Sequence, residues 1–122
     1  MNKYEKLFQE IYKMTKDGSI TWKLISKDSN AQIVFNSNLV FRQFESKMVK
    51  NEDEYKILFV EKKAIEPDYD YLEKYWPEVL ILNDGELIAS LGDSIIEKSE
   101  LISLVELIES KSDKAKKLFN QD

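Results

Sequence analysis

A tight turn between two apolar runs is the feature that most restricts how this chain can fold. Asn83-Asp84-Gly85-Glu86 separates Val79-Leu80-Ile81-Leu82 from Leu87-Ile88-Ala89. An Asp-Gly pair suits the two-residue hairpin turns that need positive φ at both central positions. The sequence therefore predicts an antiparallel β-hairpin over residues 79–91, which Gly92-Asp93-Ser94 closes.

In the first third of the chain, the spacing of apolar residues changes from that of a helix to that of a strand. Asn2 followed by Glu5 fits a capping box, and Asp17-Gly18 fits a helix end. Between them, apolar residues recur at helical spacing: Tyr4, Leu7, Phe8, Ile11 and Tyr12. After the glycine, every second residue is apolar (Ile20, Trp22 and Leu24), so we expect the helix to give way to a strand.

Three further extended segments are expected in the middle of the chain, at 32–35, 39–45 and 55–61. Polar clusters at 28–30 and 51–54 predict turns, and the cluster at 36–38 is either a bulge or a second turn. Short polar turns cannot carry a parallel crossover, so these strands are expected to pair antiparallel.

The last third has the pattern of a helix. Leu101, Leu104, Val105 and Ile108 form an apolar stripe, which Ser110-Lys111-Ser112 interrupts. Either Ser94 together with Glu97, or Ser99 alone, is expected to cap this helix. A short basic turn or helix over 113–119 then offers Leu118 and Phe119 for docking.

These elements predict one compact α+β domain over residues 1–122. We expect an N-terminal helix, a mostly antiparallel sheet of about five strands arranged as a β-meander, and C-terminal helices packed on the sheet. In strand 79–82, the side chains that point to either face of the sheet are all apolar. The strand is therefore expected to be covered on both faces or to lie under the connection that precedes it.

The composition removes most catalytic chemistries. The chain has no histidine and no cysteine, so it holds no Ser-His-Asp or Cys-His arrangement and no Cys/His zinc site. Its three glycines, Gly18, Gly85 and Gly92, are isolated and do not form a phosphate-binding loop. We therefore expect a non-catalytic protein without a metal or cofactor.

Charge is unevenly distributed along the chain. Residues 1–60 carry 10 basic and 8 acidic side chains, residues 61–110 carry 4 and 13, and residues 111–122 carry 4 and 2, for the total of −5. A net −9 over 61–110 would repel nucleic acid and attract basic surfaces. The alternative is that these carboxylates only keep the protein soluble.

Residue usage predicts the kind of organism that makes the protein and where in the cell the protein lies. Glu5 comes early and no unbroken apolar stretch follows it, which argues against a secretory signal. The longest aliphatic run, 79–82, is far shorter than the roughly 20 residues of a spanning helix. With no cysteine, one arginine and many lysines and isoleucines, the sequence indicates a cytoplasmic protein of a bacterium or phage, without membrane contact.

An acidic and aromatic connection at 66–78 is the candidate partner-binding segment. Large rigid rings beside carboxylates suit a basic protein surface, and the residues assigned to it are Asp68, Tyr69, Asp70, Tyr71 and Glu73. Tyr71, Leu72, Tyr75 and Trp76 also recur at one helical turn. The segment is therefore either a recognition loop or a short helix, and we expect Leu72 and Trp76 to pack in the core.

One segment leaves an enzymatic alternative open. Ile57-Leu58-Phe59-Val60 is followed by Glu61-Lys62-Lys63, and an apolar strand that ends in Glu-x-Lys resembles the half-motif of restriction-endonuclease-like nucleases. The resemblance covers about seven residues and implies that acids hold a divalent metal while Lys63 steadies the attacking water. Only position suggests an acidic partner, which would be Glu45 or Asp53.

The sequence thus favours an acidic protein-binding module, such as a small inhibitor, an immunity or antitoxin protein, or an accessory protein of a phage or mobile element. Its partner is expected to be a protein with a basic surface. The alternatives are a metal-dependent nuclease that uses Glu61 and Lys63, or a structural domain that forms homo-oligomers. Arg42 is either an anion anchor or, as the favoured role, a partner for a carboxylate or an aromatic ring.

Overall fold

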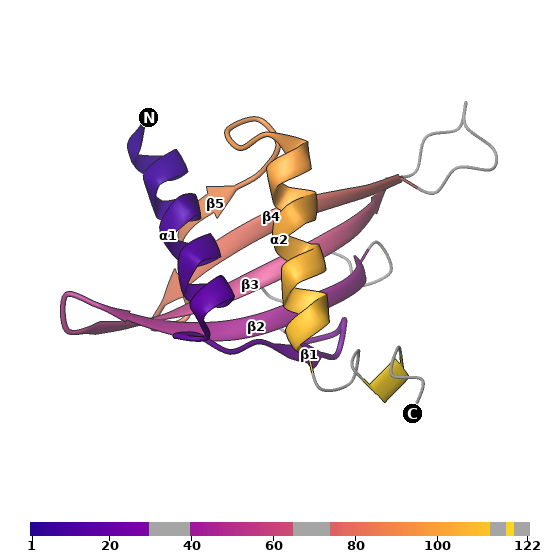
Figure 1. The fold of residues 1–122 in the computed structure, drawn as a ribbon, viewed down its shortest axis with the longest axis horizontal. Coiled ribbons are helices and arrows are strands. Elements are labelled where there is room, and N and C mark those ends of the chain that lie inside the picture. Colours follow the sequence, from indigo (N-terminus) through magenta and orange to yellow (C-terminus); the bar gives the residue numbers. More distant parts are fainter. Residues whose placement is uncertain (30–39, 65–73, 113–116, 119–122) are drawn as a thin grey trace.

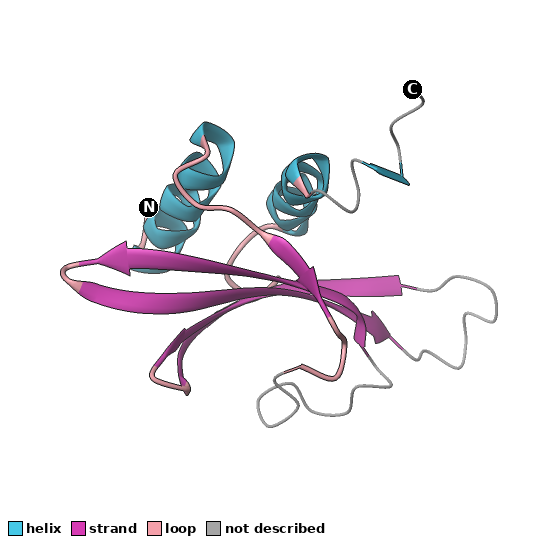
Figure 2. Cartoon of the chain, turned by 90° about the horizontal axis from the view of Figure 1, so that it is seen from below, coloured by secondary structure: helices cyan, strands magenta, loops and turns pink. Residues whose placement is uncertain are grey.

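The computed structural model describes residues 1–29, 40–64, 74–112 and 117–118. Two helices cover one face of a five-stranded antiparallel sheet (Figures 1 and 2). The fold is α+β, with an N-terminal helix, a β-meander and a C-terminal helix on the sheet, as the sequence predicted. None of the described helices is both long and apolar enough to cross a membrane.

The first helix, α1 (Lys3–Asp17), has both of its predicted ends. Asn2 is the N-cap, and its side-chain oxygen accepts a hydrogen bond of 2.9 Å from the backbone N–H of Glu5. Gly18 ends the helix with φ of 83°, a left-handed conformation that costs glycine little. These local signals therefore fix where the chain enters and leaves α1.

The strands follow one another in the sheet in the order of the sequence. They are β1 (Lys23–Ile25), β2 (Val40–Lys50), β3 (Asp53–Ala64), β4 (Lys74–Asn83) and β5 (Glu86–Leu91), and every neighbouring pair is antiparallel. Two-residue turns close two of the hairpins, at Asn51-Glu52 and at the predicted Asp84-Gly85. Both residues of each turn have positive φ, as the twist of such hairpins requires.

Several predicted boundaries were wrong. The turn after β2 has two residues instead of four, so β3 begins already at Asp53. β1 has only three residues, because Ile20 and Trp22 come before the paired segment. The expected strand at 32–35, the interruption at 36–38 and most of the terminal helix at 113–119 lie outside the described residues; within that last segment, Leu118 is helical and exposed.

The second helix, α2 (Lys98–Lys111), begins without the predicted cap. Its N-cap is Glu97, whose side chain makes no capping hydrogen bond, so neither Ser94 nor Ser99 has the expected role. The predicted stripe does face the sheet, since Leu101, Leu104, Val105 and Ile108 are all buried. Burial of this stripe positions α2 on the sheet despite its weak cap.

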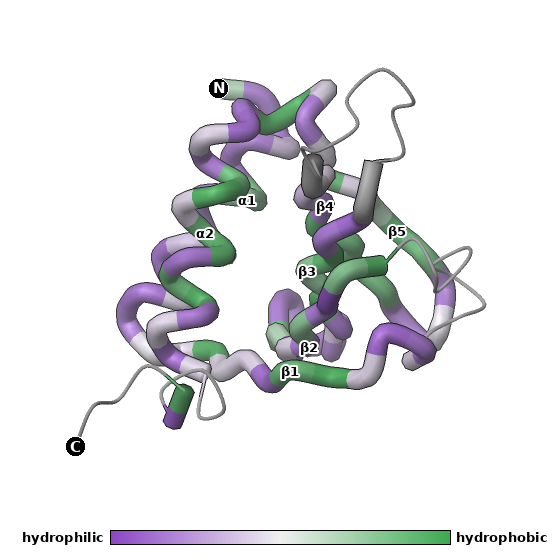
Figure 3. The backbone as a smooth tube through the Cα atoms, turned by 90° about the vertical axis from the view of Figure 1, so that its right-hand side faces the viewer, coloured by the Kyte–Doolittle hydropathy of each residue, from purple (hydrophilic) through white to green (hydrophobic). Residues whose placement is uncertain are grey.

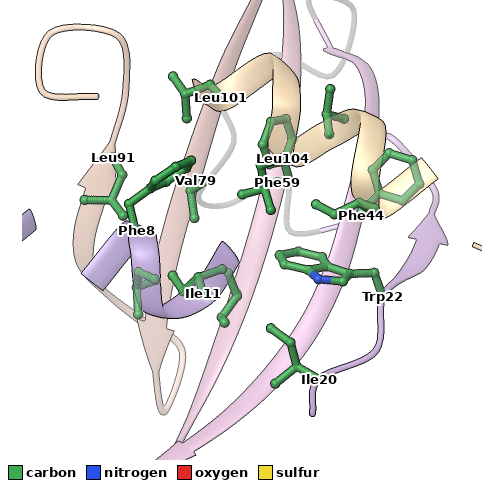
Figure 4. Packing of buried hydrophobic residues seen from close by; sticks show 14 of the residues in the cluster. Phe8, Ile11, Ile20, Trp22, Phe44, Phe59, Val79, Leu91, Leu101 and Leu104 are labelled. Carbon is green, nitrogen blue, oxygen red and sulfur yellow. The ribbon is translucent and has the colours of Figure 1, made fainter. Parts of the chain in front are cut away.

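The face of the sheet under the helices (Figure 3), here called the helix face, carries the main core (Figure 4). Phe44, Phe59, Val79 and Leu91 project from the strands toward Phe8 and Ile11 of α1 and toward the stripe of α2. Trp22 closes this core near β1, and its Nε1–H donates to Thr15 Oγ1 at 3.0 Å. The indole is therefore buried with its polar atom satisfied.

The opposite side of the sheet, here called the far face, holds a smaller apolar cluster. Its members are Val40, Leu58, Val60, Leu80 and Leu82, none more than 4% exposed. β3 and β4 are thus apolar on both faces because both faces are covered, one of the two arrangements expected for strand 79–82. Gln43 ties the turn after β1 to this region, since its Nε2 donates to the carbonyls of Ser26 and Ser29, both at 2.8 Å.

Candidate functional site

The candidate site lies at one end of the sheet, where β2 begins, β3 ends and β4 begins. The strand register places Val40 opposite Lys62, and Lys62 opposite Trp76. Helix α2 crosses the strands here, with Lys98 close to Trp76 and Glu109 close to Arg42 (Figure 1). Charged and aromatic residues therefore form two groups here, Arg42 with Glu109 and Trp76 with Lys98. The two groups are about 16 Å apart along α2, for eleven residues of helix.

A three-residue ion network occupies the helix face of this end. Arg42 Nε donates to Glu61 Oε1 at 2.8 Å, and Arg42 Nη2 donates to Glu109 Oε2 at 2.7 Å. The guanidinium also lies over the rings of Phe41 and Phe44, 5.5 Å and 5.2 Å from their centroids. Arg42 thus takes the predicted role of a partner for carboxylates and rings, and it links α2 to β2 and β3.

The pKa values of Glu61 and Arg42 are both raised, but for different reasons. Burial raises the pKa of Glu61, and the nearby charge of Glu109 raises it further, so the hydrogen bond and charge of Arg42 offset this only in part. Burial lowers the pKa of Arg42, but its bonds to Glu109 and Glu61 outweigh burial and the net shift is upward. Glu61 is therefore a buried acid held by a base that stays charged.

The far face of the same end carries a second acid with the opposite behaviour. Lys62 Nζ donates to Glu78 Oε2 at 2.7 Å, and Ser90 Oγ donates to the other oxygen of Glu78. Burial raises the pKa of Glu78, but the bonds from Lys62 and Ser90 and the charge of Lys62 outweigh it, so the net shift is downward. Glu78 is thus held in its charged form between β3 and β5.

Trp76 corrects two expectations for the aromatic connection. Trp76 and Tyr75 belong to strand β4, so the helical period from Tyr71 to Trp76 does not form a helix at its described end. Trp76 is 38% exposed and does not join the core. Its ring instead lies 5.1 Å from Lys98 Nζ, a cation–π distance.

The residues assigned to partner binding, Asp68, Tyr69, Asp70, Tyr71 and Glu73, lie outside the described residues, as does Leu72. The positions where their segment joins the sheet are described: β3 ends at Ala64, and β4 begins at Lys74. The segment therefore emerges at the end of the sheet that holds Arg42, Glu61 and Trp76. Its role in binding stays a prediction.

The acids named for the nuclease alternative do not meet at Glu61. Glu45 lies opposite Leu58 of the far-face cluster, so it projects from the other face of the sheet and pairs with Lys23 and Lys56. Asp53 is at the other end of β3, about 26 Å from Glu61 for eight residues of strand. Over the ranges described here, no group of three His, Cys, Asp or Glu residues could hold a metal ion. The side chain of Lys63 is outside the description.

A run of uncompensated acids follows the hairpin turn. Residues 84–110 contain seven acids and one base, Lys98, for a net charge of −6. Six of the acids are exposed: Asp84, Glu86, Asp93, Glu97, Glu100 and Glu106. The seventh, Glu109, is the one that Arg42 binds. This described part of the acidic field lies on the hairpin turn, β5, the loop after it and α2, where Glu100 faces α1 and accepts a hydrogen bond of 3.3 Å from Gln9 Nε2.

The sequence could have indicated part of the ion network, but not its geometry. Arg42 stands out as the one arginine in a chain with 17 lysines, and Glu109 lies off the apolar stripe of α2. Nothing local pairs them, because they are 67 residues apart. Comparisons with known proteins add no assignment: no family model, no curated protein and no solved structure matches this chain.

Proposed function

We propose that this protein is a non-catalytic protein-binding module that occludes a basic surface of a target protein. A small inhibitor, an immunity or antitoxin protein and an accessory protein of a phage or mobile element all work in this way. Such work needs shape and charge but no catalytic group.

The uncompensated acids of residues 84–110 carry this proposal. Elsewhere in the described chain, several carboxylates are paired with lysines: Glu10 with Lys50, Glu45 with Lys56 and Glu78 with Lys62. On α2, Glu100 and Glu106 are exposed, and neither forms an ion pair with a described residue. Acids without local counter-charge attract a basic partner over a distance of several ångströms and select against acidic ones.

Exposed apolar side chains accompany these acids. Leu87 and Ile88 on β5 are 50% and 57% exposed, and Ile102 on α2 is 42% exposed. Charged residues steer a partner and set specificity, while apolar contact supplies most of the binding free energy. Exposed acids and exposed apolar side chains thus occur on both β5 and α2, which supports a binding role over a purely solubilising one.

The test is capture of a target by the purified protein, first at low and then at raised salt, followed by direct binding to that target after its purification. A double charge reversal, Glu100→Lys with Glu106→Lys, should weaken binding by about tenfold or more, because two attractions become repulsions. The matched control is Asp28→Lys with Glu52→Lys, which changes the net charge equally at exposed positions outside the field.

A second variant tests the connection itself. Reversal of Asp68, Asp70 and Glu73 to lysine should weaken the same complex and leave the circular dichroism spectrum of the protein unchanged. If the target binds both reversed proteins as tightly as the control, the acidic field has no role in recognition and the proposal fails.

A further inference from the structure

Strand β5 forms one edge of the sheet. It ends the strand order β1-β2-β3-β4-β5 and pairs only with β4 among the described strands. The backbone groups on its outer side therefore lack a ladder partner in the described part of the chain. A row of such groups is a template on which another extended segment can pair.

The middle of β5 lacks the charged side chains that commonly protect a strand edge. Residues Leu87–Leu91 include no charge, and the first two are the half-exposed Leu87 and Ile88. The opposite edge differs: β1 has three residues, and lysines mark it and the uncovered part of β2, at Lys23, Lys47 and Lys50. Edge strands are commonly blunted by short length and by lysine. The β1 edge has both, whereas the uncharged stretch of β5 has no lysine.

A bulge divides β5 into two parts. Ile81 pairs with Ala89 while Leu82 pairs with Leu87, which leaves Ile88 as the extra residue. Bulges interrupt a regular edge locally. Regular pairing is therefore available from Ala89 to Leu91, and Leu87 and Ile88 provide apolar contact beside it.

Acids at both ends of the strand determine which partner fits. Asp84 and Glu86 precede the uncharged stretch, and Asp93 and Glu97 follow it, all exposed. If a second copy paired with β5 in antiparallel orientation, Glu86 of one chain would lie beside Asp93 of the other at each end. A parallel arrangement would also place acids beside acids. Like charges opposite each other destabilise a strand pair, so self-pairing is disfavoured.

We propose that β5 receives an extended segment of a target protein as a sixth strand, and that this segment has uncharged β-forming residues flanked on both sides by lysine or arginine. Main-chain hydrogen bonds would give affinity, and the flanking bases would meet the acids at the two ends of β5. The inference rests on the proposed function for the basic character of the target, and it adds the site and the mode of binding.

A synthetic peptide of the pattern Lys-Lys-Val-Thr-Val-Thr-Val-Lys-Lys, with a fluorescent label, tests this mode without knowledge of the target. Anisotropy should show saturable binding that weakens with salt. A peptide of the same sequence with alternate backbone nitrogens methylated keeps every charge but loses strand pairing, and it should bind at least about tenfold more weakly. A version with glutamate in place of lysine should not bind.

Protein variants locate the site. Neutralisation at the ends of β5 by Asp84→Asn, Glu86→Gln and Asp93→Asn should weaken peptide binding by about tenfold, because both ends lose their charge partners. Neutralisation of three acids elsewhere, by Asp28→Asn, Glu52→Gln and Asp53→Asn, changes the net charge equally and should have little effect. The edge variant Ile88→Lys should also abolish binding, since lysine blunts a strand edge.

Three results would overturn the inference. Equal binding of the methylated peptide would mean that only charge attracts it, and equal effects of the two neutralised proteins would mean that the site is not at β5. Light scattering that shows a dimer, reduced to a monomer by Ile88→Lys, would assign the edge to a second copy. Each result leaves the proposed function standing if the protein still captures a target with Glu100- and Glu106-dependent affinity, so the two proposals can fail separately.

Discussion

The helix face and the far face of the sheet are both covered, but they hold a carboxylate in opposite ways. On the helix face, Glu61 lies in the network with Arg42 and Glu109. Its pKa is raised because the effect of burial is larger than the opposite effect of Arg42. On the far face, Glu78 accepts hydrogen bonds from Lys62 and Ser90. Its pKa is lowered because the effect of these donors is larger than the opposite effect of burial. The two acids belong to neighbouring strands at the same end of the sheet.

This difference separates structural charge from charge that is available to a partner. Glu61 is 7% exposed, and its network joins α2 to the strands beneath it. Such a network specifies where α2 docks, but a partner protein cannot reach its carboxylate. Among the described residues, the exposed acids of β5 and α2 form no ion pair, although Glu100 accepts a hydrogen bond of 3.3 Å from Gln9 Nε2. The proposed interface is therefore placed there and not at Glu61.

The largest effects should come from the apolar residues that project from β3 into the cluster on each face. Phe59 on the helix face and Leu58 on the far face are both 0% exposed. Phe59→Ala should lower the free energy of unfolding by about 4 kcal/mol and Leu58→Ala by about 3 kcal/mol, since each leaves a cavity. Urea denaturation at neutral pH measures both, and Val49→Ala at a 72% exposed position should change stability by less than about 0.5 kcal/mol.

A small loss of stability in Leu58→Ala would contradict the view that both faces of the sheet are covered. If its effect is below about 1 kcal/mol while Phe59→Ala keeps its full effect, the far-face cluster is open to water in solution. The far face would then be a second exposed apolar surface rather than a covered one.

Removal of the shared base should have the next largest effect. Arg42→Met keeps an apolar stem over Phe44 but leaves Glu61 and Glu109 without their cation, which should cost about 3 kcal/mol at neutral pH. The double variant Arg42→Met with Glu61→Gln should recover a large part of that loss, because the buried negative charge is gone. If the double variant is no more stable than the single one, the loss reflects packing and not charge.

Local signals predicted the parts of this fold that local physics decides. Asn2, Gly18 and Asp84-Gly85 set a helix start, a helix end and a hairpin, because each depends on a few neighbouring residues. The antiparallel pairing of β2 with β3 and of β4 with β5 followed from short turns, which allow only antiparallel neighbours. The start of α2 was predicted wrongly because burial of its stripe, and not a side-chain cap, stabilises it.

The candidate site was less predictable because its contacts are long-range. Trp76 was expected in the core from the general burial of tryptophan, but β4 carries it to a rim where Lys98 covers part of its ring. The link between Arg42 and Glu109 depends on how α2 crosses the sheet, which no periodicity in either segment reveals. The opposite environments of Glu61 and Glu78 likewise depend on which face each strand presents.

The smallest effects, and the most specific to the comparison, are in the pH dependence of stability. The pKa of Glu78 is lowered from 4.5, so the unfolded chain takes up its proton first and this contribution to stability is lost as the pH falls below about 4.5. The pKa of Glu61 is raised from 4.5, so the folded chain holds its proton longer and stability falls as the pH rises above about 4.5. Urea unfolding across this range should therefore show a shallower acid loss for Glu78→Gln and a gain above pH 4.5 for Glu61→Gln, relative to the unmodified protein. Slopes that change in the same direction in both variants would mean that the two faces do not hold their acids differently.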